Sequence, residues 1–114
     1  MIKTNILTKN NKNIHIDNYK SFIEKNDFNK IMSLFSRMLL ANNWKDYSFS
    51  KEKDRVIFCF YRHSYENPIC KIIYQKKSNS FKNWITTYSD NKSRTSNSLE
   101  KIIHWIESKY PKII

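Results

Sequence analysis

The chain contains no glycine, and this absence limits both the turns it can make and the sites it can build. Phosphate-binding loops of the Walker and Rossmann types, and nucleophile elbows, need a residue without a Cβ where the backbone meets phosphate or turns sharply. These sites are therefore excluded. Asparagine tolerates the left-handed backbone conformation that glycine usually supplies, so we expect asparagine where the first helix ends.

The chain of 114 residues has room for one small domain with a single hydrophobic core. It is 39% hydrophobic and 15% aromatic, which is too rich in aromatic residues for a disordered chain. No apolar run approaches the roughly 20 residues of a membrane span. Residues 1–13 lack the continuous apolar core of a secretory signal. We therefore expect a cytoplasmic protein that does not associate with a membrane.

The first strong periodic signal predicts an α-helix over residues 27–41. Its apolar positions recur with helical spacing and form one stripe, made of Phe28, Ile31, Met32, Phe35, Met38 and Leu39. Asn26 or Asp27 is expected to supply the side-chain oxygen of the N-cap. Asn42 and Asn43 follow the last apolar turn and are expected to end the helix.

Three or four antiparallel strands are predicted after this helix. Residues 55–63 are β-branched and aromatic on both alternating faces, which is typical of a central strand covered, at least in part, on each side. Residues 64–68 have turn composition, and residues 69–75 return as the hairpin partner. The remaining segments are a strand over residues 44–49, a strand from Phe81 or Trp84 to Tyr88, and polar loops over residues 76–82 and 89–97.

An amphipathic helix closes the chain, with Asn97 or Ser98 at its start and Pro111 at its end. Its apolar face carries Leu99, Ile102, Ile103, Ile106 and Tyr110. Because such helices need a sheet face to bury their stripes, we predict a two-layer α+β domain. It comprises an N-terminal helix, an antiparallel sheet of three to four strands and a C-terminal helix. The domain is expected to span residues 19–114, after a flexible tail of residues 1–18.

The chain is strongly basic, with 21 lysine and arginine residues against 10 acidic ones and a net charge of +11. This charge favours anionic partners such as nucleic acid. Lysine, asparagine and isoleucine also share A/T-rich codons, so genome base composition is an alternative explanation. Aromatic residues recur along the predicted strands with lysines among them, as in sheets that stack bases. They are Tyr47, Phe49, Tyr61, Tyr74, Trp84 and Tyr88, for which packing beneath the helices is the alternative.

We therefore expect a small, basic, non-enzymatic module that binds RNA or single-stranded nucleic acid. The candidate binding residues are Lys76, Lys77, Lys82, Trp84, Lys92 and Arg94. The alternative is a protein-interaction or regulatory adaptor, with a homodimer as one form. The predicted sheet edges favour it, and so does Trp105, which lies off the apolar stripe of the last helix.

A second group of candidates comprises Arg37, Trp44, Asp46 and Arg62. A fork between the Arg37 guanidinium and the Asp46 carboxylate would fix the first helix against the sheet, and we favour this interpretation. Alternatively, two arginines beside an indole would hold a phosphate group or stack on a base.

No catalytic site, metal site or cofactor is predicted. His63 and Glu66 lie in or beside a hairpin turn, and no nucleophile with an orienting group accompanies them. Cys59 and Cys70 lack a second pair of ligands at metal-binding spacing. We expect two reduced, mostly buried thiols, with a disulfide across the hairpin as the alternative.

The stretches FNKIMSLFSRMLLANNWKDYSF and DRVIFCFYRHSYENPICKI resemble an uncharacterised family of small alphaproteobacterial proteins, described as a domain of unknown function. The resemblance covers about residues 23–114 and is most specific at Arg37, Trp44, Asp46, Tyr47, Phe58, Arg62, Glu66 and Pro68. Where the family has glycine, this chain has Ser36 and Asn42, and the loop before its last helix reads NKSRTSNS. The resemblance implies the domain limits and an intracellular bacterial setting, and it implies no reaction.

Overall fold

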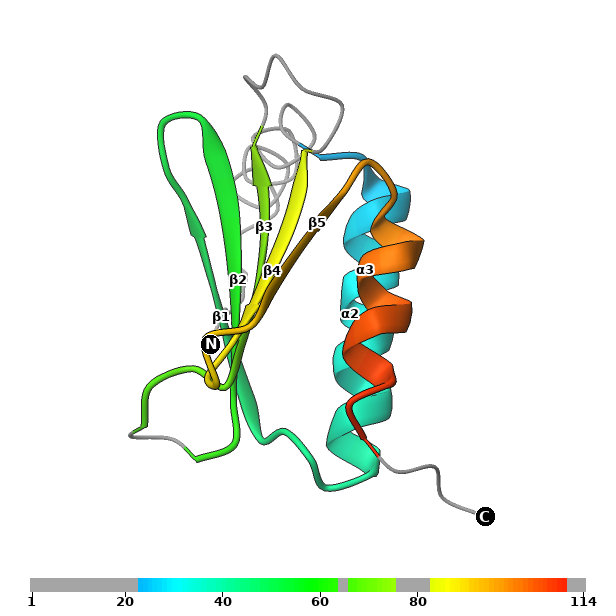
Figure 1. Ribbon diagram of the computed structural model, residues 1–114, viewed down its shortest axis with the longest axis vertical. Coiled ribbons are helices and arrows are strands. Elements are labelled where there is room, and N and C mark those ends of the chain that lie inside the picture. Colours follow the sequence, from blue (N-terminus) through cyan, green and yellow to red (C-terminus); the bar gives the residue numbers. More distant parts are fainter. Residues whose placement is uncertain (1–22, 64–65, 76–82, 111–114) are drawn as a thin grey trace, which may run out of the picture.

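The computed structural model describes residues 23–63, 66–75 and 83–110 (Figure 1). Their elements are, in order, α2 (Lys25–Leu40), β1 (Asp46–Lys51), β2 (Arg55–Tyr61), β3 (Cys70–Gln75), β4 (Trp84–Tyr88), β5 (Ser93–Ser96) and α3 (Leu99–Glu107). The sheet forms one layer, and both helices lie over the same face of it (Figure 1). The predicted two-layer α+β fold is thus confirmed. The predicted tail, residues 1–18, and the lysine-rich loop, residues 76–82, lie outside the described residues.

The sheet has five antiparallel strands in the order of the chain, so each strand pairs with its sequence neighbour. The prediction of three to four strands was therefore too low. The additional strand is β5, which lies in the segment predicted as a polar loop. It pairs in register with β4, from Trp84 opposite Ser96 to Thr87 opposite Ser93. Because β5 contains only serine, threonine and arginine, it lacks the apolar alternation by which a strand is recognised.

The end of α2 and the start of α3 agree with the predictions. The other two helix ends differ, because α3 ends at Glu107, before the predicted end at Pro111, and α2 starts earlier than predicted. The start of α2 also has a different cap. That helix has Glu24 as its N-cap, with no side-chain capping bond, so the predicted cap at Asn26 or Asp27 is wrong. Asp27 instead lies in the first turn, where its charge favours the positive end of the helix dipole. Ser98 caps α3 as predicted, because its Oγ accepts a hydrogen bond from the backbone N–H of Lys101.

Asparagine does take the place of glycine in this fold. Among the described residues, the positive φ angles are those of Asn42 (66°), just after α2, and Asn91 (68°), in the β4–β5 turn. Both values lie in the left-handed region that usually favours glycine. The turns therefore remain tight although the chain has no residue without a Cβ.

A single core fills the space between the sheet and the helices. Alternate residues of β2 point toward the helices and are fully buried, namely Val56, Phe58 and Phe60. They meet the buried stripes of α2 and α3, which include Ile31, Leu34, Ile102 and Ile106. The helices cover one face of β2. The predicted covering is therefore confirmed for that face and wrong for the other. Residues on the other face, such as Ile57 and Tyr61, are partly exposed.

The two cysteines lie on opposite faces of the sheet. Cys70 is buried beneath the helices, whereas Cys59, opposite Lys71 in the register, is partly exposed on the other face. Both thiols are free, so the predicted reduced state is confirmed and the alternative of a disulfide across the hairpin is wrong. Side chains of opposite faces point away from one another, which prevents the bond.

Candidate functional site

The predicted pair of Arg37 and Asp46 does not form. Arg37 Nε donates a hydrogen bond to Glu107 Oε2 at 2.8 Å, and a terminal nitrogen of the guanidinium donates to Ser33 Oγ at 3.1 Å. Asp46 is exposed on β1 and accepts a hydrogen bond from the backbone N–H of Tyr47. Arg37 therefore connects α2 to α3 and does not connect α2 to the sheet. The reason is that it projects from the side of α2 that carries Ser33, one turn earlier.

Trp44 has a structural role and does not form a site with Arg37. It is fully buried, and its ring is stacked on that of Phe60 with 4.4 Å between the ring centres. Its Nε1 donates a hydrogen bond to the hydroxyl of Tyr110 at 2.7 Å. The hydroxyl of Tyr88 also donates to Tyr110. The fourth candidate, Arg62, is exposed just beyond β2. Burial raises the pKa of Tyr110, and the charge of Arg62 opposes this larger effect by lowering that pKa.

The buried titratable groups beneath the helices are held in their neutral forms. Burial raises the pKa of the Cys70 thiol to about 12. Burial also raises the pKa values of the Tyr88 and Tyr110 phenols, and the hydrogen bond between them raises that of Tyr88 further. None of the three groups is ionised near neutral pH. They are therefore not activated as nucleophiles.

The strand aromatics are divided very unequally between the two faces of the sheet. The register places five of the six predicted rings toward the helices: Tyr47, Phe49, Tyr74, Trp84 and Tyr88. Only Tyr61 faces the other way, with its hydroxyl 3.1 Å from Ser48 Oγ. The interpretation as an exposed base-stacking platform is therefore wrong, and packing beneath the helices explains most of these residues.

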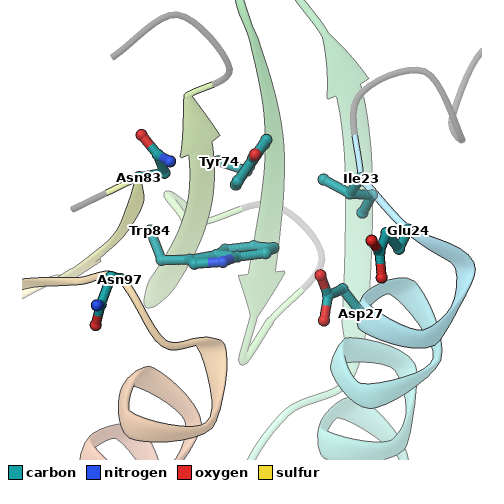
Figure 2. Close-up of a pocket in the computed structure, with 7 residues that line it drawn as sticks. All are labelled: Ile23, Glu24, Asp27, Tyr74, Asn83, Trp84 and Asn97. Carbon is teal, nitrogen blue, oxygen red and sulfur yellow. The ribbon is translucent and has the colours of Figure 1, made fainter. Parts of the chain in front are cut away.

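Trp84, one of the predicted nucleic-acid-binding residues, is only 5% exposed. It lines a pocket of about 220 Å³ between the start of α2, the end of β3 and the start of β4 (Figure 2). The carboxylates of Glu24 and Asp27 lie across this pocket from the Trp84 indole (Figure 2). Burial, opposed by the charge of Lys30, raises the pKa of Asp27. Because carboxylates repel phosphate groups, we remove Trp84 from the candidate residues.

The other predicted binding residues divide into two sets. Lys76, Lys77 and Lys82 lie outside the described residues. Lys92 and Arg94 are described, and both are exposed at the edge of the sheet formed by β5.

Lys92 and Arg94 belong to a basic surface that β5 shares with α3. The guanidinium carbon of Arg94 lies 5.3 Å from the ring centre of Trp105. Lys109 Nζ lies 4.7 Å from the same ring centre and 4.8 Å from that of Tyr88. We define the β5–α3 surface as Lys92, Arg94, Lys101, Trp105 and Lys109.

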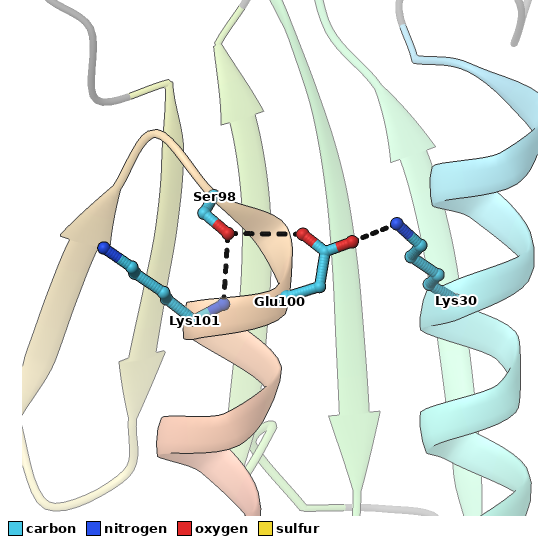
Figure 3. A network of polar contacts seen from close by, with 4 residues as sticks. All are labelled: Lys30, Ser98, Glu100 and Lys101. Carbon is cyan, nitrogen blue, oxygen red and sulfur yellow. Dashed lines mark hydrogen bonds and ion pairs between the residues drawn. The ribbon is translucent and has the colours of Figure 1, made fainter.

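Helical spacing places these side chains of α3 on one flank. Lys101, Trp105 and Lys109 are four residues apart, so they follow one another along the helix and just past its end. Figure 3 shows Lys101 extending toward β5, whereas Glu100 extends toward α2 and meets Lys30. Ser98 joins the two, since its Oγ contacts both Glu100 and the backbone of Lys101. Within one turn of α3, the basic side chain of Lys101 therefore extends toward β5 and the acidic side chain of Glu100 extends toward α2.

The β5–α3 surface has an excess of positive charge. Lys109 Nζ lies 3.6 Å from Asp90 Oδ2. Among the described residues, no carboxylate lies within 4.0 Å of the charged groups of Lys92, Arg94 or Lys101. Four cations are therefore balanced by one close carboxylate on this surface.

Sequence reasoning found this surface only in part. It named Lys92 and Arg94 and singled out Trp105, but it missed Lys101 and Lys109. The available signal was their spacing, because each lies four residues from Trp105 on a helix that had been predicted.

The described part of the chain contains no helix of the length and hydrophobicity needed to cross a membrane. Within the same residues, there is no group of three or more histidine, cysteine, aspartate or glutamate side chains that could hold a metal ion.

Of three comparisons with known proteins, one gave a match, to a protein family. Neither a search of curated proteins nor a search of solved structures returned a significant match. The family described as "Protein of unknown function (DUF2794)" matches residues 21–100. The matched span contains α2, the whole sheet and the first residues of α3. The chain therefore belongs to this family of proteins of unknown function.

Proposed function

We propose that the protein is a binding module for single-stranded nucleic acid, RNA or DNA, and that the strand binds at the β5–α3 surface. The observation that carries the proposal is the Trp105 ring, which lies within 5.3 Å of the Arg94 guanidinium and 4.7 Å of the Lys109 ammonium. An aromatic ring among cations combines the two interactions by which proteins hold a single strand without reading its sequence.

The first of these interactions is electrostatic. Lys92, Arg94 and Lys101 have exposed charges with no close carboxylate among the described residues. Phosphate groups placed on them would release condensed counterions, which favours binding at low salt. Lys101 and Lys109 are separated by about 12 Å along the helix axis, so the surface contacts more than one phosphate group.

The second interaction is stacking. Trp105 is partly exposed, and stacking of a base on an aromatic side chain contributes about 1–3 kcal/mol. Only an unpaired base can expose its face to such a ring, so the surface favours a single strand over a duplex. The arrangement offers no set of side chains to read base edges, and we expect weak sequence preference.

The direct test is fluorescence anisotropy with a labelled single-stranded oligonucleotide of mixed sequence, at salt concentrations from about 50 to 200 mM. The logarithm of the binding constant should fall linearly with the logarithm of the salt concentration. The variant Arg94→Gln/Lys101→Gln should bind more weakly and flatten this slope by about 1.4, since each phosphate contact on a single strand contributes about 0.7.

The matched control is Lys45→Gln/Lys53→Gln. It removes the same charge from exposed positions that flank β1, the edge of the sheet opposite β5. Its slope should stay close to that of the unmodified protein. Equal losses in the two variants, or no binding of the unmodified protein at about 50 mM salt, would contradict the proposal.

The adaptor alternative ranks second. Leu39 and Leu40, at the end of α2, are 45% and 87% exposed, and groups of exposed apolar side chains mark surfaces that contact other proteins. Adjacent helix positions point in different directions, however, so these leucines do not form one continuous apolar face. Light scattering of the purified protein tests the homodimeric form of this alternative.

A further inference from the structure

A polar pocket of about 430 Å³ lies at the end of the sheet where β3 begins, β4 ends and β5 begins. We call it the Lys71 pocket. Its lining includes Lys71, Thr87 and Ser93 from the strands, together with Asn67, Ser89 and Asn91 from the adjoining loops. No residue that lines this pocket belongs to the β5–α3 surface, and Lys71, Thr87 and Ser93 lie on the face of the sheet that the helices do not cover. Tyr88, which also lines the pocket, is the strand residue of the lining that lies on the covered face.

The sheet register brings these three strand residues into one row. Lys71 lies opposite Thr87, and Thr87 lies opposite Ser93. Thr86 is buried beneath the helices, so Thr87, the next residue, points to the other face. Directly opposite residues of antiparallel strands have Cβ atoms about 5 Å apart. The side chains of Lys71, Thr87 and Ser93 therefore leave the sheet in one row and line one pocket.

The lining of the pocket contains donors of hydrogen bonds and no carboxylate. Two acidic residues adjoin the lining in sequence, Glu66 beside Asn67 and Asp90 between Ser89 and Asn91. Asp90 accepts a hydrogen bond from the backbone N–H of Lys92 and pairs with Lys109, and Glu66 is exposed and does not line the pocket. Lys71 is itself partly buried, and no carboxylate of the described residues lies within 4.0 Å of its ammonium. Such an ammonium favours an anion as its partner.

We propose that the Lys71 pocket binds the oxyanion of a phosphate group, with Lys71 supplying the countercharge and Thr87 and Ser93 donating hydrogen bonds from their hydroxyls. Ammonium and hydroxyl groups are standard donors to phosphate oxygens. Two sources of this group fit the pocket equally: free inorganic phosphate, and the terminal phosphate of a nucleic-acid strand. The proposal does not depend on binding at the β5–α3 surface.

The test is a titration of the isotope-labelled full chain with sodium phosphate, followed by amide NMR shifts, with sodium chloride holding the ionic strength constant. Saturable shifts are expected at Lys71, Thr87 and Ser93. Lys71→Gln should weaken phosphate binding at least 10-fold, since it removes the charge. Thr87→Val should weaken it less and keeps the branched shape of the side chain, so it tests the pocket if Lys71→Gln is unstable.

Lys45→Gln is the matched control, because it removes an exposed lysine from the opposite edge of the sheet, and it should titrate like the unmodified protein. A comparison of oligonucleotides with and without a 5′-phosphate separates the two sources: a preference that Lys71→Gln abolishes identifies the strand terminus. Shifts that do not saturate, or that Lys71→Gln leaves unchanged, overturn the proposal. Arg94→Gln/Lys101→Gln should retain phosphate binding, so the two proposals fail separately.

Discussion

Along the flank of α3 that faces α2, each acidic side chain of the helix meets a cation, whereas along the flank that faces β5 two cations lie over an aromatic ring and one close carboxylate is present. Toward α2, Glu100 pairs with Lys30 and Glu107 pairs with Arg37. Toward β5, Arg94 and Lys109 lie over the ring of Trp105. The same kinds of charged residue therefore produce two neutral ion pairs on one side of the helix and a positive surface on the other.

This difference shows where the charge of a basic protein is available for binding. A lysine or arginine that already faces a carboxylate contributes little field at a distance, because the two charges cancel. A cation over a ring keeps its full charge, since the ring attracts it only through its quadrupole. The net charge of +11 therefore says less about the binding surface than the distribution of carboxylates does.

The largest effect that separates the two flanks is expected at Trp105. Trp105→Ala should reduce the affinity for a single-stranded oligonucleotide by about 5- to 150-fold, because it removes stacking worth about 1–3 kcal/mol. The affinity of Trp105→Phe should lie between those of the unmodified protein and Trp105→Ala, since a smaller ring remains. Fluorescence anisotropy measures both variants, and thermal melts monitored by circular dichroism show whether they remain folded.

Tyr61→Ala provides the control for this prediction. Tyr61 is also partly exposed, but it lies on the face of the sheet that the helices do not cover. Its loss should leave the affinity nearly unchanged. If Tyr61→Ala weakened binding as much as Trp105→Ala, the strand would lie on the uncovered face, and the contrast between the flanks of α3 would have no bearing on binding.

The fold was largely predictable because its signals are local and periodic. The stripe of α2, the hairpin of β2 and β3, and the cap at Ser98 each depend on residues close together in the sequence. The fifth strand was missed because its pairing with β4, and not the hydrophobicity of its own residues, makes it a strand. Likewise, α2 begins at Lys25 without a side-chain cap, so no residue type marks its start.

The functional surface was less predictable because it depends on which residues meet across the fold. Arg37 and Glu107 are 70 positions apart, and nothing in the local pattern of either one names the other. The sequence of β4 does not indicate which face of the strand is covered. Trp84 is buried because the helices lie over the face on which its side chain projects. Arg94 was named from the sequence as a candidate nucleic-acid-binding residue, and it is exposed, but its contact with Trp105 depends on the pairing of β5 with β4.

A smaller effect is expected from the ion pair on the α2 flank. The side chains of Arg37 and Glu107 are 49% and 38% exposed, so water screens the pair and its contribution to stability should be about 0.5 kcal/mol. A double-mutant cycle of Arg37→Ala and Glu107→Ala, measured by urea unfolding, should give a coupling free energy of about this size. A cycle of Arg37→Ala and Asp46→Ala should give no coupling free energy. Coupling of Arg37 to Asp46 alone would restore the interpretation that the structure overturned.

The smallest effect is the pH dependence of the second ion pair on that flank. The hydrogen bond from Lys30 lowers the pKa of Glu100 below its ordinary value of 4.5, and the same bond raises the pKa of Lys30 above 10.5. The Glu100 contribution to stability is therefore present above pH 4.5 and is lost as the pH falls through the lowered pKa. The Lys30 contribution is present below pH 10.5 and is lost as the pH rises through the raised pKa.

Lys30→Gln should accordingly lower the melting temperature slightly between these two limits, and the difference from the unmodified protein should vanish at lower and at higher pH. Lys101→Gln, on the β5 flank of the same turn, removes a lysine that has no close carboxylate among the described residues. Its melting temperature should differ from that of the unmodified protein by the same amount across the acidic range. A difference for Lys30→Gln that stayed constant as Glu100 became protonated would show that the pair adds nothing, and that both flanks of α3 are held by their apolar contacts alone.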